Sequence, residues 1–214
     1  MTQTTKWIIG LVVIVIVGWG SYYLVINKSN VPADEIKIGV VIPLTGVRAD
    51  AGEFTKNGLS IAEEEVNNDK TRKYKLTFVF EDSKYEPQTA VSAVKKLMDF
   101  NSINYFIGPY GSSEVLAVAP VTEENKKILI VHGAQSEDIS NAGDYVFRII
   151  HNSAQEAPIF AKFVASKMSS DTLHVLALNT AITDPYIKSF RPNFEAAGKT
   201  IGLIEKYDAK ASAF

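Results

Sequence analysis

From residue 36 onward, short runs of apolar and β-branched residues alternate with longer segments whose apolar residues recur every three or four positions. The short runs are typical of buried strands, and the longer segments are typical of amphipathic helices. Parallel strands need a crossover connection, usually a helix, so this alternation predicts a parallel sheet covered by helices. The fold class that we expect is α/β with a doubly wound parallel sheet.

The alternation divides into a first unit at residues 31–148 and a shorter second unit at residues 149–214. The predicted strands of the first unit lie at residues 36–42, 74–80, 105–107, 128–131 and 145–149, and its predicted helices begin near residues 50, 87 and 113. The last of these strands is expected to cross to the second unit. The predicted elements of the second unit are a helix at 154–167, a strand at 173–178, a helix at 186–197 and a strand at 200–207. Two βα units make a thin layer, so we expect an incomplete second α/β lobe.

Several helix boundaries carry recognisable signals. Asp50 with Glu53 three residues later has the spacing of a capping box at the start of the first helix. The apolar face expected for this helix includes Phe54 and Ile61. Pro87 suits the first turn of the next helix, and Gly198 is typical of the residue that ends one.

Residues 7–26 contain no charged side chain. Twenty residues in a helix rise about 30 Å, which is the thickness of the hydrocarbon core of a bilayer. Lys6 precedes the stretch while Asp34 and Glu35 follow it, so we expect a cytoplasmic amino terminus and an extracytoplasmic remainder. We favour an uncleaved transmembrane helix within residues 1–30, which places the protein at the cell membrane. The alternative is a cleaved signal that yields a secreted or periplasmic protein.

The composition and the absence of several motifs exclude many functions. The chain has 22 Lys plus Arg, 24 Asp plus Glu and no Cys, which gives no reason to expect a nucleic-acid partner or a cysteine-ligated metal. A dinucleotide-binding glycine turn, a phosphate loop and a nucleophile elbow are all missing from the sequence. We therefore expect no catalytic residues, no metal site, no cofactor and no enzymatic activity.

Three isolated polar residues allow both a functional and a structural interpretation. His132 follows a predicted strand, and we interpret it as a solvated loop residue rather than a ligand contact. His174 lies inside an apolar strand and is expected to be a hydrogen-bonded core or edge residue. Asp82 ends a strand, where capping of a loop is the better interpretation than a role as a catalytic base.

Three predicted strand ends carry the small and polar residues that a ligand site needs. In an open parallel sheet, ligands bind beyond the carboxyl ends of the strands. One of these ends leads into a helix, whose unpaired first amides and positive dipole end favour an anion such as a carboxylate. The alternative for the serine pair at this position is a helix N-cap. The candidate ligand-binding residues are Thr45 after the first strand, Tyr110, Gly111, Ser112 and Ser113 after the third, and Gly133, Ala134 and Gln135 after the fourth.

A series of short motifs follows in order from residue 36 to the end of the chain. They include Pro43-Leu44-Thr45-Gly46, Glu81-Asp82-Ser83, Ile107-Gly108-Pro109, Ser112-Ser113, Gly133-Ala134 and Phe194-Glu195-Ala196-Ala197-Gly198. In order and spacing they resemble the type I periplasmic solute-binding proteins of the branched-chain amino acid (Leu/Ile/Val) group, the extracytoplasmic receptors of ABC importers. Members of this family are well over three hundred residues long, so the chain resembles the first lobe and part of the second.

The resemblance implies two α/β lobes that close over a small solute and present the closed form to an ABC permease in the membrane. It implies that Ser112 and the segment 133–135 hold the α-carboxylate of an amino acid, while Tyr110 and Gly111 line the side-chain pocket. Gln135 stands where amino acid binders have a threonine. The expected function is a receptor for a small carboxylate-bearing solute, an amino acid or amide. The alternative is the ligand-sensing ectodomain of a signalling receptor.

Two positions at the expected ligand differ from the family or are ambiguous. Ala51 stands where the family often has an aromatic residue that covers the ligand. After the first strand of the second lobe, either Ile182-Thr183 or Tyr186 matches the family's Tyr-Gly, depending on the alignment.

Overall fold

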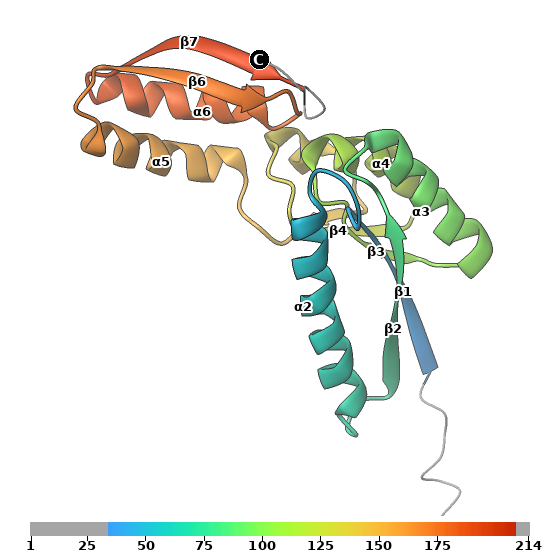
Figure 1. Ribbon diagram of the computed structural model, residues 1–214. Coiled ribbons are helices and arrows are strands. Elements are labelled where there is room, and N and C mark those ends of the chain that lie inside the picture. Colours follow the sequence, from blue (N-terminus) through green and yellow to red (C-terminus); the bar gives the residue numbers. More distant parts are fainter. Residues whose placement is uncertain (1–33, 209–214) are drawn as a thin grey trace, which may run out of the picture.

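The computed structural model describes residues 34–208, which contain two parallel sheets (Figure 1). The strand order of the larger sheet is β2-β1-β3-β4-β5, and the smaller sheet pairs β6 with β7. All neighbouring strands are parallel, so the predicted α/β class is confirmed. The strands are β1 (Asp34–Ile42), β2 (Tyr74–Asp82), β3 (Tyr105–Ile107), β4 (Ile128–Val131), β5 (Val146–Arg148), β6 (Thr172–Leu178) and β7 (Thr200–Tyr207).

Five α-helices and one 3-10 helix connect the strands within the described residues. The helices are α2 (Ala49–Asn68), α3 (Pro87–Asn101), α4 (Ser112–Glu124), η2 (Glu137–Asn141), α5 (Ser153–Lys167) and α6 (Thr183–Ala196). The predicted helices agree with α2 to α6, apart from α6, which begins three residues earlier than predicted. The short helix η2 was not predicted, because five residues are too few for a helical period to show in the sequence.

We call residues 34–148 the first lobe and residues 149–208 the second lobe. The core of the first lobe lies where α3 and α4 cover the sheet, and Val94, Leu97, Phe106, Val118 and Leu129 are fully buried there. Burial of such a side chain stabilises the fold by about 1.5–3 kcal/mol. This core supports the carboxyl ends of β1, β3 and β4, from which the candidate binding segments extend.

In the second lobe, α5 and α6 cover one face of the two-stranded sheet (Figure 1). Ala157 and Ala161 of α5 and Phe194 of α6 are fully buried in this layer. Leu176 of β6 and Leu203 of β7 are mainly exposed. The lobe is therefore a two-layer unit whose sheet is covered on one face only, within the described residues.

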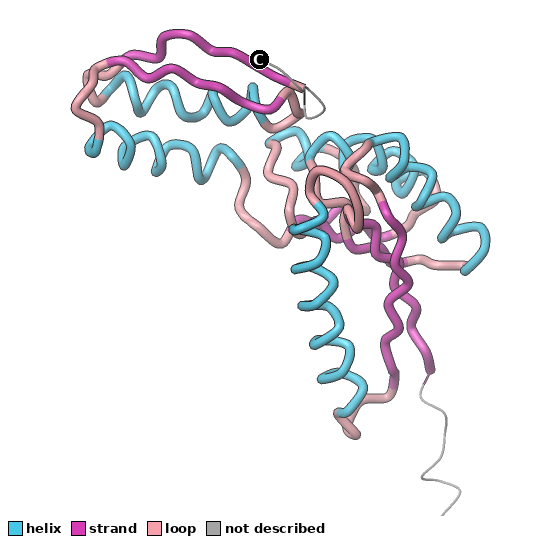
Figure 2. The backbone as a smooth tube through the Cα atoms, in the orientation of Figure 1, coloured by secondary structure: helices cyan, strands magenta, loops and turns pink. Residues whose placement is uncertain are grey.

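Figure 2 shows β1, β2 and α2 projecting beyond the rest of the first lobe. The reason is the register: β1 pairs with β2 along nine residues but with β3 along only three. Since α2 has only this narrow ribbon to pack against, Phe54 and Ile61 are 73% and 60% exposed. The apolar face predicted for this helix is therefore not buried at these two positions.

Two local predictions also need correction. The N-cap of α2 is Arg48, and Asp50 lies in the first turn without forming a capping box, so the helix starts two residues earlier than that motif requires. The segment expected to cross between lobes instead forms β5, an edge strand parallel to β4. Backbone hydrogen bonds at both ends, from Leu129 to Tyr145 and from Ile149 to Val131, hold it to the sheet.

The expected membrane segment at residues 7–26, with the whole of the predicted anchor unit 1–30, lies outside the described residues. Across residues 34–208, no helix has the length and apolar character needed to span a bilayer.

Candidate functional site

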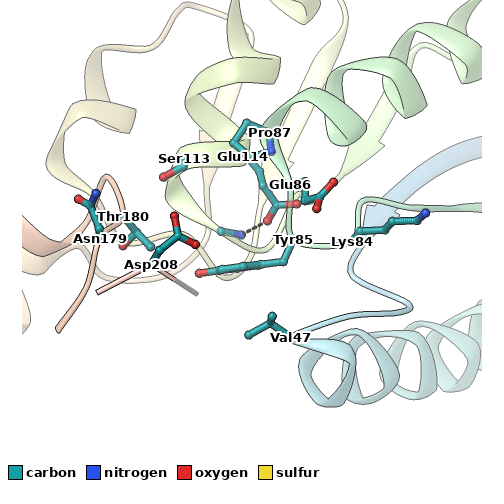
Figure 3. A pocket seen from close by; sticks show the side chains of 11 residues that line it. Val47, Lys84, Tyr85, Glu86, Pro87, Ser113, Glu114, Asn179, Thr180 and Asp208 are labelled. Carbon is teal, nitrogen blue, oxygen red and sulfur yellow. Dashed lines mark hydrogen bonds between the residues drawn. The ribbon is translucent and has the colours of Figure 1, made fainter. Parts of the chain in front are cut away.

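A cavity of about 320 Å³ lies between the two lobes (Figure 3). We call it the interlobe cavity. Its lining includes Tyr85, Gly111, Ser113 and Glu114 of the first lobe and Thr180 and Asp208 of the second lobe. The first-lobe residues come from the loop after β2 and the start of α4, and the second-lobe residues follow the ends of β6 and β7. The cavity thus lies at the carboxyl ends of strands in both sheets, where parallel α/β folds bind ligands.

Asp82, at the end of β2, fixes the loops beneath this cavity. Its carboxylate accepts hydrogen bonds from the amides of Leu44 (2.9 Å), Thr45 (3.2 Å) and Lys84 (2.9 Å), and from the Thr45 hydroxyl (2.5 Å). Partial burial raises the pKa of Asp82, but these hydrogen bonds outweigh burial and the pKa lies below its ordinary value. The predicted loop-capping role is therefore confirmed. Thr45, a candidate ligand contact, is exposed and engaged with Asp82.

Tyr85 lies across one side of the interlobe cavity with its hydroxyl directed toward the second lobe (Figure 3). Both Lys84 and Tyr85 have left-handed backbone conformations, with φ of 54° and 60°, which turn the ring toward α4. A Cβ at Gly111 would lie 2.7 Å from the ring, so only glycine allows this packing. Burial raises the pKa of the Tyr85 hydroxyl, and the nearby Glu114 charge raises it further.

Glu114, in the first turn of α4, is 1% exposed and lines the same cavity. Its Oε2 accepts a hydrogen bond from the Gly111 amide at 2.9 Å, which is the contact that caps α4. Its Oε1 has no hydrogen-bond partner among the described residues. Burial raises the pKa of Glu114 more than the Ser83 hydroxyl and the Gly111 amide lower it.

The two adjacent serines, both predicted to bind ligand, have different surroundings. Ser112 is 5% exposed, and its Oγ accepts a hydrogen bond from the Ser136 amide at 3.2 Å, inside the first lobe. Ser113 lines the interlobe cavity, and its Oγ accepts a hydrogen bond from the second-lobe Ala181 amide at 3.0 Å. The alternative of a serine N-cap was wrong, because the N-cap of α4 is Gly111.

Tyr110 and Gly133 are placed beside the cavity rather than in its lining. The Tyr110 hydroxyl accepts a hydrogen bond from the Arg48 guanidinium at 3.3 Å, and that guanidinium lies 5.1 Å from the centre of the Tyr110 ring. A Cβ at Gly133 would lie 2.6 Å from the same ring. These contacts place Tyr110 between the start of α2 and the loop after β4.

Ala134 and Gln135 of the loop after β4 face neighbouring protein groups. Ala134 is 2% exposed and belongs to the first-lobe core. The Gln135 amide nitrogen donates to Glu156 Oε2 of α5 at 2.6 Å and lies 2.8 Å from His151 Nε2. Among the eight candidate residues, Gly111 and Ser113 are the ones that line the interlobe cavity.

A second space of about 310 Å³ adjoins the first, and the two share Tyr85 and Thr180. Ile182, Thr183 and Tyr186 of the second lobe line it. Both sequence alternatives for the second-lobe contact, Ile182-Thr183 and Tyr186, therefore reach the same space. Burial, together with Glu156, raises the pKa of Tyr186.

His132 and His174 each contact a neighbouring protein group through one ring nitrogen. His132 is partly buried with Nε2 3.2 Å from the Thr55 hydroxyl, and burial lowers its pKa, so the interpretation as a solvated loop residue was wrong. His174 Nδ1 accepts a hydrogen bond from the Leu203 amide at 2.9 Å, as expected of a satisfied strand residue. Within the described part of the chain, no cluster of three or more His, Cys, Asp or Glu could hold a metal.

Tyr85 and Glu114 line the cavity although neither was predicted from the sequence. A signal existed for Glu114, because a glutamate three residues after Gly111 has capping-box spacing at the start of a predicted helix. For Tyr85 the sequence offers only its place in a loop between Asp82 and Pro87.

The family model described as periplasmic binding protein matches residues 35–214. The chain is 27% identical over 168 residues to the Leu/Ile/Val-binding protein BraC3 of Rhizobium johnstonii, covering 78% of this chain and 46% of that protein. It is 24% identical over 196 residues to a leucine-, isoleucine-, valine-, threonine- and alanine-binding protein of Pseudomonas aeruginosa, covering 91% and 50%. The chain thus spans about half the length of these relatives.

Solved structures share the fold. A leucine-binding protein from Thermotoga maritima superposes with a TM-score of 0.73 at 21% identity, over 84% of this chain and 51% of that one. A solute-binding protein of an ABC transporter from Rhodopseudomonas palustris, in complex with 3,4-dihydroxybenzoic acid, gives 0.73 at 22% identity, over 82% and 48%. The chain belongs to the periplasmic binding protein family, in its type I branched-chain amino acid group, and corresponds to an N-terminal part of its members.

Proposed function

We propose that this chain is part of an extracytoplasmic receptor of an ABC importer that binds a small carboxylate-bearing solute, an amino acid or amide, between its two lobes. The observation that carries the proposal is the interlobe cavity, which lies at the carboxyl ends of parallel strands and is lined from both lobes. The names of the relatives, which include amino acid-binding proteins, support the same solute class.

The start of α4 is the part of the cavity suited to a carboxylate. The first amides of a helix lack partners within the helix, and its dipole is positive at this end. Ser113 adds a hydroxyl that lines the cavity and already contacts the second lobe through Ala181. A carboxylate bound here would touch both lobes, and a solute that binds the closed arrangement more tightly shifts the population toward it.

Three polar contacts join residues of the first and second lobes. Gln135 contacts Glu156 of α5, Ser189 of α6 donates to Glu137 at 2.6 Å, and Ser113 accepts from Ala181. Polar contacts of this kind exchange easily with water, so they suit two lobes that open and close. We propose that the closed form is recognised by an ABC permease and that the segment at residues 7–26 anchors or exports the protein.

A thermal-shift screen with amino acids, their amides, urea and aromatic acids tests the proposal. A solute at 100 times its dissociation constant stabilises the folded state by about 2.7 kcal/mol, which raises the melting temperature measurably. We expect amino acids or amides to produce the largest shifts. Stabilisation by none of these solutes, or chemical turnover of a solute by the purified chain, would contradict the proposal.

A further inference from the structure

His132 directly follows β4 and joins the carboxyl end of the larger sheet to the second turn of α2. Its Nε2 lies 3.2 Å from the Thr55 hydroxyl. That hydroxyl donates its one proton to the Ala51 carbonyl oxygen at 2.8 Å, so toward the ring it can only accept. When the ring is neutral, its proton is therefore on Nε2, and Nδ1 carries a lone pair.

The other ring nitrogen has a different environment. Nδ1 of His132 is buried and has no hydrogen-bond partner among the described residues. Protonation would turn this nitrogen into a charged N–H donor that is buried without an acceptor, which is far more costly than a buried neutral nitrogen. The protonated ring should therefore turn toward solvent and give up its contact with Thr55.

The groups that face the ring do not favour its charged form. From α2 the contact is the uncharged Thr55, and from the loop after β3 the Tyr110 ring stands edge-on with its centre 6.0 Å away. Beyond Tyr110 lies the Arg48 guanidinium, and on the β5 side the charged residue is Arg148, so both charges are positive. Burial lowers the pKa of His132, and no acid offsets this among the described residues.

The contact with His132 lies where α2 has little other support. A Cβ at Gly52 would overlap a backbone carbonyl oxygen of the loop after β1, so the first turn lies directly against that loop. Phe54 is mainly exposed and adds little packing. At the far end of α2, the Asn67 amide group both donates to and accepts from the Leu76 backbone. Loss of the His132 contact should therefore loosen the first turns and leave the far end attached.

We propose that His132 is a pH-sensitive switch: the neutral ring holds the first turns of α2 against the sheet, and the protonated ring releases them. This inference goes beyond the proposed function and does not depend on which solute binds. The switch bears on the space between the lobes, because Val47 and Arg48 directly precede α2. Val47 lines the interlobe cavity, and Arg48 lines the space that adjoins it.

The pH range of the switch follows from the direction of the pKa shift. The folded-state pKa of His132 is lowered, so the stabilisation of α2 is fully present above the ordinary pKa of 6.5 and is lost as pH falls through the folded value. Within this window, each pH unit favours the released state by up to about tenfold. Below the window the ring is protonated in both states, and release no longer changes with pH.

Hydrogen exchange of the full chain from pH 8 to pH 4, corrected for the intrinsic exchange rate at each pH, tests the switch. We expect amides of residues 53–58 to lose about tenfold or more in protection, while α3 and α4 keep theirs. His132→Gln places an amide donor near the position of Nε2 and does not titrate, so it should abolish this loss. The control His174→Asn keeps an acceptor for the Leu203 amide and should retain the wild-type response.

A second measurement on the wild-type chain covers the case in which His132→Gln does not fold. Long-range ¹H–¹⁵N NMR spectra of the His132 ring report both its tautomer and its titration. We expect the Nε2–H tautomer at neutral pH and a titration that coincides with the loosening of residues 53–58. A neutral ring protonated on Nδ1, or a ring that titrates while these amides stay protected, would overturn the switch.

The hydrogen-exchange outcomes are equally decisive. Constant protection of residues 53–58 across the pH range, or a pH response that persists in His132→Gln, would show that this ring does not control α2. Equal loss of protection in α3 and α4 would show general unfolding in acid and would also overturn the switch. The proposed function is tested separately by the solute screen, so neither result decides the other.

Discussion

The two walls of the interlobe cavity differ in how firmly they are built. On the first-lobe side, Asp82 holds the loops after β1 and β2, and the buried Ser112 ties the start of α4 to the loop after β4. On the second-lobe side, the exposed Asn179 and the half-exposed Thr180 follow a two-stranded sheet. A preorganised wall favours recognition, and a less constrained wall favours closure. The contrast predicts that the first-lobe wall is the more rigid of the two.

The cores beneath the walls show the same difference. The first-lobe core extends from α3 and α4 across β1, β3 and β4 and includes the fully buried Phe106. The second-lobe core lies between two helices and one face of β6 and β7, with Phe194 at its centre. A two-layer unit with a short sheet buries less apolar surface, so we expect it to open at a lower free energy.

The largest predicted effect on stability comes from a substitution in the first-lobe core. Phe106→Ala removes a fully buried ring from β3 and should lower the free energy of unfolding by about 3–5 kcal/mol. Urea denaturation followed by circular dichroism measures the change. Phe54→Ala on α2, where the ring is 73% exposed, is the matched control and should change stability by less than about 0.5 kcal/mol. Equal effects of the two variants would show that the first-lobe core does not support the fold.

Phe194→Ala places the same change in the second lobe. Hydrogen exchange should then accelerate in α5, α6, β6 and β7, while amides of α3 and α4 keep their protection, because the two cores share no buried residue. Equally faster hydrogen exchange in both lobes would contradict the independence of the two cores. Phe106→Ala examined in the same way should affect the first lobe more.

Asp82→Asn weakens the hydrogen bonds that hold the loops after β1 and β2, and it leaves the first-lobe core unchanged. The loss of a charged acceptor for three amides and one hydroxyl should lower stability by about 1–3 kcal/mol near pH 7. The folded-state pKa of Asp82 is lowered, so its contribution is present above the ordinary pKa of 3.8 and is lost as pH falls through the folded value. Urea titrations from pH 7 to pH 2 should show the two chains converging in acid. A constant difference would exclude the ionised carboxylate as the source.

The strands, the helix start and the capping residue that support the first-lobe side of the cavity were predicted, because each has a local sequence pattern. The strands β3 and β4 were located correctly from short apolar runs, and α3 begins at Pro87 as predicted. Asp82 was recognised as a capping residue from its place at a strand end. Gly111 and Ser113, which line the cavity, were predicted from their place after a strand end. Each of these depends on neighbours in sequence or on a general property of parallel sheets.

The rest of the cavity depends on packing between distant segments. Tyr85 reaches α4 only because two successive residues adopt left-handed conformations and Gly111 leaves room for its ring. Glu114 reads in sequence as a first-turn acidic residue that could face solvent, and its burial depends on the loop after β2 folding over it. The hydrogen bond of Ser112 likewise could not be predicted from nearby residues, since its donor is the distant Ser136 amide.

Glu114→Gln should have a smaller effect on stability than Asp82→Asn, and its dependence on pH should have the opposite sign. Burial raises the folded-state pKa of Glu114, so the stability linked to its neutral form is full below the ordinary pKa of 4.5 and is lost as pH rises through the folded value. The charge of the nearby Asp82 raises the pKa of Glu114 further, while hydrogen bonds from Ser83 and Gly111 lower it. Relative to Glu114→Gln, the wild-type chain should therefore lose stability from acid toward neutral pH in urea titrations. A gain over this range would show that the buried carboxylate is satisfied as an ion.

The smallest predicted effect concerns the contact between the walls. Ser113→Ala removes the acceptor for the Ala181 amide, which is partly buried, and should weaken binding of any solute found in the screen by about 0.5–1.5 kcal/mol. Stability of the first lobe should be almost unchanged, because the Ser113 hydroxyl bonds only across the lobes among the described residues. The control is Ser166→Ala on α5, whose hydroxyl bonds a backbone carbonyl of its own helix. If both variants bind solute like the wild-type chain, the Ser113 contact does not hold the closed arrangement, and closure rests on the other contacts between the walls.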